Sequence, residues 1–492
     1  MMTGEHNMER LYHKLASYDQ EDVYPFHMPG HKRNPAVMGS FFPGGQDITE
    51  ITGFDNLHHP EGILLEASRH AAQVYGSRFT FLGVNGSTGM ILSAISACVH
   101  RKGKLLLARN SHRSAYHAVY LRDLNPVYLY PRRKEDMEFN GSIRPEDVEK
   151  ALLSDSEIEA VFVTSPTYDG VVSDIRSIAE AAHKRGIPLI VDEAHGAHFI
   201  FSDVFPESAV QSGADIVIHS VHKTLPSLTQ TSLLHICSDR IDRDLVQRFL
   251  TIYQSSSPSY ILMSSIDACM EEMQEKGQQL FSAYERRLED ARERLCRLQR
   301  FRLADPVRDY PDTVYDYDPS KLIISTKNTG MTGQELAVRL REEYRLEMEM
   351  SAPSYVIALS SVGDTEEGFE RLAQALSNLE SEMEEEKHLP ERTDDPEVQN
   401  SSPAEEAVSV YPEQVVPIAE AMEGKTKTIS LMESEGCISA EFLLLYPPGI
   451  PLITPGERIT GQLLQNVRRY LEQGLTVTGL KDRTNRQIEV IS

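Results

Sequence analysis

Two segments of the chain place reactive side chains directly after apolar runs. One run ends at Asp192, and a second, residues 214–218, is followed by Ser220, His222 and Lys223. Short apolar runs are typical of buried strands, and open α/β sheets bind ligands at the carboxyl ends of their strands. A lysine near a carboxylate suits pyridoxal 5'-phosphate (PLP), because lysine forms a Schiff base and aspartate keeps the pyridine nitrogen protonated. Each segment alone is more often a surface lysine or a turn, but together they predict a PLP site.

A small-residue loop offers a phosphate site. Residues 84–89, Val-Asn-Gly-Ser-Thr-Gly, follow an apolar run and open a predicted helix. Backbone N–H groups at a helix N-terminus favour an anion, and Ser87 and Thr88 add hydroxyl donors. Ser220 and His222 flank Lys223 closely enough to contact the same phosphate. The alternative for the loop alone is a plain glycine-serine turn with a helix cap.

Histidines and a polar loop complete the candidate site. The imidazole of His112 follows another apolar run and could stack on the PLP ring, although a surface histidine is an equal alternative from the residues alone. His195 and His198 are three positions apart, but no third ligand with suitable spacing is evident, so we predict no metal site. His195 is better interpreted as a hydrogen-bonding group beside the cofactor, with Ala194 small enough to pack under the ring. Residues 164–170 could reach the phenolic oxygen of PLP or the substrate, or form only a turn.

The bulk composition excludes several classes of protein. The chain has 492 residues and a formal net charge of −25, which argues against nucleic acid or an anionic membrane surface as the partner. No apolar run approaches the roughly 20 residues of a membrane span. The five cysteines lack CxxC spacing, so no zinc or disulfide framework is readable, and their odd number favours a reducing cytoplasm.

Alternation of apolar runs and helical periods over residues 62–254 predicts an α/β fold with a mostly parallel sheet covered on both faces. The predicted strands lie at residues 79–84, 104–108, 160–164, 189–192, 216–219 and 232–236. A long helix is expected at 264–300, then strands at 321–326 and 354–360 and helices at 332–344 and 365–386. We predict an N-terminal arm (1–60, with a helix at 7–18), a PLP-binding large domain (61–255), a smaller α/β domain (256–386), a linker (387–410) and a separate C-terminal α+β domain (411–492).

The ordered motifs resemble those of the bacterial ornithine/lysine/arginine decarboxylases, which are fold-type I, aminotransferase-like PLP enzymes. The resemblance includes Phe-His-Met-Pro-Gly-His-Lys at 26–32, Asp-Ile-Thr-Glu at 47–50 with 53–67, Ser-Ser-Pro-Ser-Tyr at 256–260, and Tyr-Pro-Pro-Gly-Ile-Pro at 446–451 with Pro-Gly-Glu at 455–457. It extends from about residue 24 to residue 459.

The resemblance implies roles for individual residues. It makes Lys223 the Schiff-base lysine, Asp192 the partner of the pyridine nitrogen and His112 the stacking ring, and it places His195 beside the ring oxygen and the lysine. Ser87, Thr88, Ser220 and His222 would bind the phosphate. Ser256 would reach the active site of a partner subunit, and Glu457 and Glu441 could meet the distal cation of the substrate.

The sequence departs from the family pattern at three points. The motif at 26–32 begins near the N-terminus, so we expect a short member without the N-terminal wing of the large decarboxylases, forming a homodimer or a dimer-based oligomer. The ring-supporting segment reads Asp-Glu-Ala-His-Gly-Ala-His instead of the Asp-Ser-Ala-Trp type. Cys437 replaces an arginine that is usual in the C-terminal domain, which affects local contacts there.

The resemblance implies decarboxylation of L-arginine, L-lysine or L-ornithine to agmatine, cadaverine or putrescine, with the substrate left open. Lys223 or His222 would protonate Cα after CO2 leaves, and the product could serve polyamine biosynthesis or acid tolerance. One alternative is another fold-type I reaction such as an aminotransferase, although no arginine is identifiable to grip the α-carboxylate. A non-catalytic regulatory relative is disfavoured, because it would not need Lys223, Asp192, Ser87 and His222 together.

Overall fold

The computed structural model describes residues 24–26, 30, 32, 34–37, 50, 54–134, 136–387, 412–446, 449–472 and 474–492. The helix predicted at 7–18 and residues 388–410 of the predicted linker lie outside the described residues, as does most of the predicted arm. The domain boundaries given above therefore stay a prediction.

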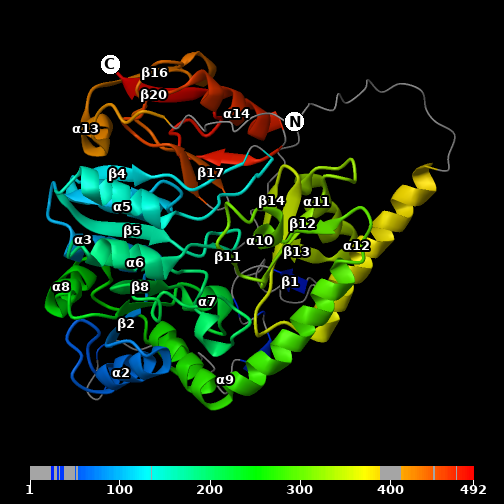
Figure 1. Cartoon of the computed structure of the whole chain (residues 1–492), viewed down its shortest axis with the longest axis horizontal. Coiled ribbons are helices and arrows are strands. Elements are labelled where there is room, and N and C mark those ends of the chain that lie inside the picture. Colours follow the sequence, from blue (N-terminus) through cyan, green and yellow to red (C-terminus); the bar gives the residue numbers. More distant parts are fainter. Residues whose placement is uncertain are drawn as a thin grey trace, which may run out of the picture.

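A seven-stranded sheet in the order β2-β9-β8-β7-β5-β3-β4 forms the centre of the large unit (Figure 1). Its strands are β2 (Phe79–Gly83), β3 (Lys104–Ala108), β4 (Asn125–Leu129), β5 (Ile158–Thr164), β7 (Leu189–Asp192), β8 (Ile216–His219) and β9 (Ser232–Ile236). The neighbours from β4 to β8 run parallel, whereas β9 runs antiparallel to both β8 and β2. Since β2 therefore points the same way as β8, every strand except β9 has its carboxyl end at one edge of the sheet.

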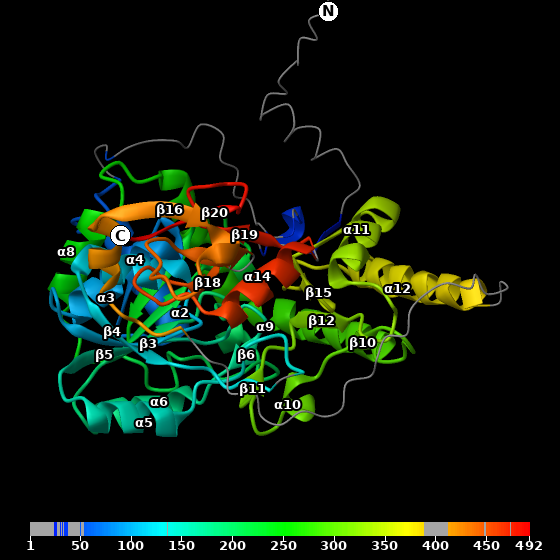
Figure 2. The ribbon, with the colours of Figure 1, turned by 90° about the horizontal axis from the view of Figure 1, so that it is seen from above.

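Helices cover both faces of this sheet, as the sequence predicted. Figure 2 shows α5 (Pro145–Ser154) and α6 (Ile175–His183) on one side of the strands, and α3 (Gly86–Cys98) and α4 (Arg113–Arg122) on the other. Successive side chains of a strand point to opposite faces. Leu105 and Leu107 accordingly pack in the core under α3, α4 and α8 (Arg243–Tyr253), while Leu106 packs in the core under α5 and α6.

A second, four-stranded sheet in the order β10-β12-β15-β14 packs against long helices. Its strands are β10 (Arg302–Leu303), β12 (Lys321–Ser325), β14 (Met350–Ala352) and β15 (Tyr355–Leu359), with α9 (Tyr260–Leu295), α11 (Gly333–Tyr344) and α12 (Glu366–Lys387) around them. In Figure 1, α9 runs from α2 (Ile63–Tyr75) beside the large sheet to α12. The short strand β1 (Tyr24–Phe26) pairs in parallel with β13 (Leu346–Met348).

Two short strands join the units. β6 (Val171–Val172), in the large unit, pairs antiparallel with β11 (Asp316–Tyr317), which precedes β12. This pairing brings the loop before β12 next to the loop that follows β5. Residues far apart in the sequence therefore meet beside the carboxyl-end edge of the large sheet.

The C-terminal part has its own small core. β16 (Thr426–Ser430) pairs with β20 (Gln487–Ile491), and a three-stranded sheet joins β18 (Ile450–Ile453), β17 (Leu443–Tyr446) and β19 (Thr476–Thr478). Apolar residues of α14 (Gly461–Glu472) pack on these strands, while α13 (Ile418–Glu423) contacts α4 of the large unit. Among the helices that the structure describes, none combines the length and the apolar character needed to cross a membrane.

Candidate active site

Polar side chains gather at the carboxyl-end edge of the seven-stranded sheet. Ser87 lies in the first turn of α3 after β2, His112 follows β3, Asp192 is the last residue of β7, and Ser220 follows β8. The strand directions therefore bring together residues that the sequence spreads over more than 130 positions.

Lys223 lies in α7 (Val221–Thr224), a single helical turn after β8. Its Nζ is 2.9 Å from Nε2 of His195. Burial lowers the pKa of Lys223, and the charge of Asp192 opposes that effect. A lowered pKa increases the neutral fraction of the amine, which is the nucleophilic form.

Asp192 is a buried carboxylate, only 3% exposed. Within the described residues, it accepts one hydrogen bond, from the backbone N–H of Ala194 at 3.2 Å. Burial raises the pKa of Asp192 to about 6, and the charge of Lys223 and the bond from Ala194 work in the opposite direction. The carboxylate therefore retains capacity for a further hydrogen-bond donor.

The hydroxyl groups of Ser87 and Ser220 are hydrogen-bonded to each other, which joins the start of α3 to the turn before Lys223. The first-turn N–H groups of α3 have no partners within the helix, and its dipole favours an anion. Gly86 has a φ of +64°, and no atom lies within 4 Å of the position of its missing Cβ, so the turn leaves open space. Thr88 is exposed beside Ser87. The ring of His222 donates its Nδ1–H to the carbonyl of Thr231 at 2.9 Å.

His112 caps α4. Its Nδ1 accepts from the backbone N–H of Ser114 at 3.3 Å and lies 2.6 Å from the Ser114 hydroxyl. Burial lowers the pKa of His112 to about 3, and the charge of Lys223 contributes to the shift. The ring is therefore a neutral, flat group on the same edge as Lys223.

The ring of His195 is held from three directions. Its Nε2 meets Lys223, its Nδ1 lies 2.9 Å from Nζ of Lys321, and the ring of Tyr168 packs edge-on at 4.9 Å between centroids. Lys321 is the first residue of β12 and is fully buried. The sequence prediction included His195 but missed Lys321, because a lysine that opens an apolar run reads as a solvated strand end.

The structure does not bring the three predicted substrate residues to Lys223 in this chain. Ser256 is exposed in the loop between α8 and α9. Glu457 is fully buried and forms an ion pair with Arg109 at 2.9 Å. Glu441 accepts the backbone N–H groups of Lys481 and Glu489, both at 2.7 Å. Their roles toward a substrate stay predictions, and both glutamates have structural partners.

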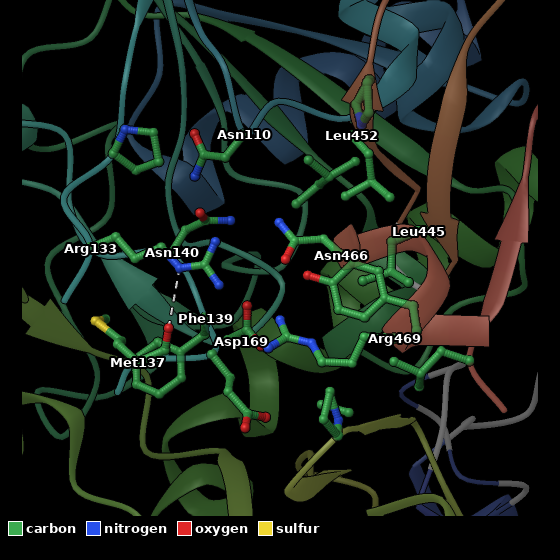
Figure 3. A pocket seen from close by; sticks show the side chains of 18 of the residues that line it. Asn110, Arg133, Met137, Phe139, Asn140, Asp169, Leu445, Leu452, Asn466 and Arg469 are labelled. Atoms are coloured by element: carbon green, nitrogen blue, oxygen red, sulfur yellow. Dashed lines mark hydrogen bonds between the residues drawn. The ribbon is translucent and has the colours of Figure 1, made fainter. Parts of the chain in front are cut away.

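A cavity of about 780 Å³ adjoins this edge where the two α/β units meet the C-terminal part. Figure 3 shows polar side chains from different parts of the chain around it, including Asn140, Asp169, Asn466 and Arg469. Lys223 is absent from its lining, but Asp169 on the lining precedes Gly170 and follows Tyr168, whose ring packs against His195. Among the described residues, no cluster of His, Cys, Asp or Glu could hold a metal ion.

Comparison with known families identifies the chain. Residues 10–368 match the major domain of Orn/Lys/Arg decarboxylases, and residues 402–478 match the C-terminal domain of the same enzymes. The chain belongs to the Orn/Lys/Arg decarboxylase family. The resemblance inferred from the motifs is thereby confirmed.

Full-length relatives within the Orn/Lys/Arg decarboxylase family support this assignment. The arginine decarboxylase of Bacillus subtilis is 33% identical over 98% of this chain and 97% of its own length. That of Halalkalibacterium halodurans is 34% identical over the same shares. The lysine decarboxylase of Pseudomonas aeruginosa is 24% identical over 94% of this chain and 75% of its own length.

Solved structures give the same fold. The Francisella novicida lysine decarboxylase has a TM-score of 0.74 at 22% identity, over 89% of this chain and 73% of that one. An alanine–glyoxylate aminotransferase from Nostoc has a TM-score of 0.53 at 14% identity, over 66% of this chain and 88% of that one. This member of the Orn/Lys/Arg decarboxylase family therefore has the fold-type I architecture of PLP-dependent enzymes. About a third of the chain lies outside the match to the aminotransferase.

Proposed function

We propose that this chain is a PLP-dependent arginine decarboxylase that converts L-arginine to agmatine and CO2. The contact between Lys223 and His195, beside the buried carboxylate of Asp192, carries the proposal within a decarboxylase family. Arginine is favoured over lysine because relatives named arginine decarboxylase are 32–34% identical to the chain, whereas those named lysine decarboxylase are 23–24% identical.

The residues at the sheet edge fit PLP. Asp192 is buried with one hydrogen bond in the described structure, so it can accept another from a pyridinium N–H. Gly86 leaves open space at the start of α3, where the Ser87 and Ser220 hydroxyls offer donors to a phosphate. Lys223 is partly exposed and thus accessible for a covalent bond. Thr88 and His222 lie next to these groups in sequence and complete the proposed phosphate set.

PLP, when bound, supplies the electron sink for the electron pair that CO2 leaves behind. Asp192 stabilises positive charge on the ring nitrogen in a buried setting, where electrostatic interactions are stronger than in water. The neutral ring of His112 offers a flat stacking surface. Lys223 Nζ and the His222 ring are the two proton donors that we assign to protonation of Cα, so each turnover consumes one proton.

One carboxylate on the lining of the cavity, Asp169, offers a partner for a cationic head group, although Arg133, Lys134, Lys327 and Arg469 line the same cavity. Asp169 lies on its lining, is only 6% exposed and accepts a hydrogen bond from the Tyr355 hydroxyl at 2.7 Å. A guanidinium group pairs well with carboxylates through two parallel hydrogen bonds. We therefore assign the distal head group to the Asp169 side of the cavity, in place of Glu457 and Glu441.

The assembly and location belong to the same proposal. We infer a cytoplasmic homodimer, or an oligomer built from dimers, with the Ser256 segment of one subunit reaching the active site of its partner and with a role in polyamine biosynthesis. The exposed position of Ser256 on an inter-helix loop supports this arrangement.

The decisive experiment is CO2 release by purified protein supplied with PLP, with L-arginine, L-lysine and L-ornithine in parallel. We expect release from L-arginine with equimolar agmatine. CO2 release from L-lysine alone or from L-ornithine alone would identify that amino acid as the substrate in place of L-arginine. No release from any of them, despite bound PLP, would overturn the decarboxylase proposal, and amino-acid formation that depends on a keto acid would favour an aminotransferase.

The Lys223→Ala variant tests the chemistry of the site. It should lose both CO2 release and the visible absorbance of lysine-bound PLP, because the Schiff base forms on Nζ of Lys223. Lys104→Ala is the matched control, since Lys104 opens β3 at the opposite edge of the sheet and pairs with Asp155 and Glu157. An unchanged spectrum in Lys223→Ala would contradict the assignment.

A further inference from the structure

His195 forms hydrogen bonds to two lysines from different units of the chain. Its Nε2 is 2.9 Å from Nζ of Lys223, and its Nδ1 is 2.9 Å from Nζ of Lys321. Lys223 follows the large sheet, whereas Lys321 opens β12 of the smaller sheet. Lys321 is fully buried, so its amine has been withdrawn from water to reach this position.

The number of available protons restricts the protonation states of His195, Lys223 and Lys321. A neutral imidazole has one N–H donor and one acceptor nitrogen, and an ammonium group has donors only. Burial and the neighbouring lysines lower the pKa of His195 well below its ordinary value, so the ring is neutral near pH 7. Two ammonium groups therefore cannot both hydrogen-bond to it. One lysine must be a neutral amine that accepts the ring N–H, while the other donates to the remaining nitrogen.

More carboxylates act on Lys321 than on Lys223, for which Asp192 and Glu349 favour the protonated form. The charges of Asp318, Glu349 and Asp169 favour protonated Lys321, whereas burial and the charge of Lys223 act against it and lower its pKa to about 8. Asp318 is fully buried and lies just before β12. Lys321 thus remains mainly an ammonium group at neutral pH, which identifies it as the donor to Nδ1.

We propose that Lys321 is a positioning residue that donates to Nδ1 of His195, fixes the ring N–H at Nε2, and thereby holds Lys223 Nζ as the neutral amine. The assignment rests on the proposed function, because the nucleophilic role of Lys223 requires the neutral form on that side. It gives His195 the role of transmitting the charge of Lys321 to the nucleophile.

The surroundings are built around this geometry. Gly170 has a φ of +103°, and a Cβ there would lie 2.7 Å from Cγ of Lys321, so the loop leaves room for the lysine stem. The ring of Tyr168 lies 5.6 Å from Nζ of Lys321 and packs edge-on against His195. The Tyr168 hydroxyl donates a hydrogen bond to Glu349, one of the carboxylates whose charge favours protonated Lys321.

The test measures the titration of Lys223 in the full-length chain freed of cofactor. Trace acetylation by acetic anhydride at a series of pH values, read by peptide mass spectrometry, reports each lysine separately because only the neutral amine reacts. Lys321→Met keeps the length of the side chain and removes the charge, Lys321→Arg keeps the charge, and Lys104→Met is the matched control. Lys104 also opens a strand and pairs with carboxylates, but at the far edge of the large sheet.

In Lys321→Met the midpoint for Lys223 should rise by about one pH unit, because the ring N–H is no longer fixed at Nε2 and a nearby cation is lost; labelling of Lys223 should therefore fall by up to about tenfold at pH values below the wild-type midpoint. Lys321→Arg should restore most of the wild-type midpoint, and Lys104→Met should leave it unchanged. An unchanged midpoint in Lys321→Met, or equal shifts in both Lys321 variants, would overturn the proposal. These outcomes do not depend on CO2 release, so they are separable from failure of the proposed function.

A second measurement determines the tautomer of His195 in the wild-type chain, so it does not depend on whether the Lys321 variants fold. Nitrogen NMR of the wild-type chain without cofactor distinguishes the two neutral histidine tautomers, and His195→Gln identifies the relevant signals by their loss. We expect the proton on Nε2. A proton on Nδ1 would overturn the proposal, because Lys321 would then be the accepting amine.

Discussion

Burial controls the protonation of the ionisable residues around Lys223. It is the largest cause of the raised pKa of Asp192 and of the lowered pKa values of His112, His195 and Lys223. The charged form of each group is therefore less favourable in the folded chain than in water. Neutral His112 and His195 beside the buried carboxylate of Asp192 are compatible with PLP, whose phosphate is anionic and whose pyridine nitrogen is protonated.

Asp192→Asn should stabilise the chain without cofactor while weakening its retention of PLP. Folding raises the pKa of Asp192 from 3.8 to about 6, so wild-type stability is lost as pH rises through this interval. A shift of this size corresponds to about 3 kcal/mol at most, reduced by the loss of the attraction to Lys223. Urea denaturation should show the variant more stable than wild type near pH 8 and the difference smaller near pH 5.

The control variant, Asp155→Asn, should change the free energy of unfolding in the opposite direction to Asp192→Asn. Asp155, half-buried and paired with Lys104, has a lowered pKa, so Asp155→Asn should lower stability at neutral pH. If Asp192→Asn were as destabilising as Asp155→Asn at neutral pH, the buried carboxylate would not carry an unfavourable charge. Unchanged PLP retention would contradict its role at the ring nitrogen.

Position relative to strand ends made part of the site predictable. Asp192, Ser220 and Lys223 follow apolar runs, so the sequence placed them on one edge. Lys321 carries no such signal, because its burial depends on the pairing of β6 with β11, which joins segments distant in the chain. Contacts created by such pairings cannot be read from local patterns.

At the scale of elements, buried strands were predicted better than the exposed edge strand. The runs at 104–108, 189–192, 216–219 and 232–236 coincide with β3, β7, β8 and β9. β4 was missed, because it contains Pro126, lies at the sheet edge and is only partly buried. Edge strands tolerate proline and lack the continuous apolar pattern of central strands.

Gly30 connects the N-terminal segment to the turn that carries Lys223. Its N–H donates to the carbonyl of His222 at 2.5 Å, and a Cβ there would lie 2.6 Å from backbone atoms of Thr224 and Leu225. Gly30→Ala should therefore displace α7 and cost about 1–3 kcal/mol of stability, with weaker PLP retention.

The matched control is Gly62→Ala, at the start of α2. The nearest atom to a Cβ there belongs to the Asp55 side chain at 3.6 Å, so no backbone has to move, but Gly62 is the N-cap of α2, where Gly is preferred to Ala. Gly62→Ala should therefore cost about 0.5–1 kcal/mol of stability and leave PLP retention unchanged. Thermal denaturation and PLP absorbance after dialysis measure both effects. Equal behaviour of the two variants would show that the contact with α7 does not constrain Lys223.

At the scale of the whole molecule, a buried ion pair joins the large sheet to the C-terminal part. Arg109 follows β3, donates to Glu457 and to the carbonyl of Pro451 at 2.8 Å, and lies over the rings of Tyr116 and Tyr128. The family resemblance suggested a substrate contact for Glu457. The sequence did not reveal its ion pair with Arg109, because that pair depends on how the large sheet and the C-terminal part pack.

Arg109→Met should destabilise the chain by about 3–5 kcal/mol, because it leaves the fully buried Glu457 carboxylate without its cation. The neighbouring pair Arg458–Glu413 is the control. It is largely exposed at 3.3 Å, so Arg458→Met should cost less than about 1 kcal/mol. Urea denaturation of both variants gives the comparison.

The double variant Arg109→Met/Glu457→Gln separates the buried charge from the loss of packing. Removal of the carboxylate should recover at least half of the lost stability, because a neutral amide tolerates burial better than an unpaired charge. A double variant no more stable than Arg109→Met would place the loss in the contacts of Arg109 with Pro451, Tyr116 and Tyr128 instead. If L-arginine turnover also persisted with an unchanged KM in the double variant, then Glu457 would act between the parts of the molecule and not on the substrate.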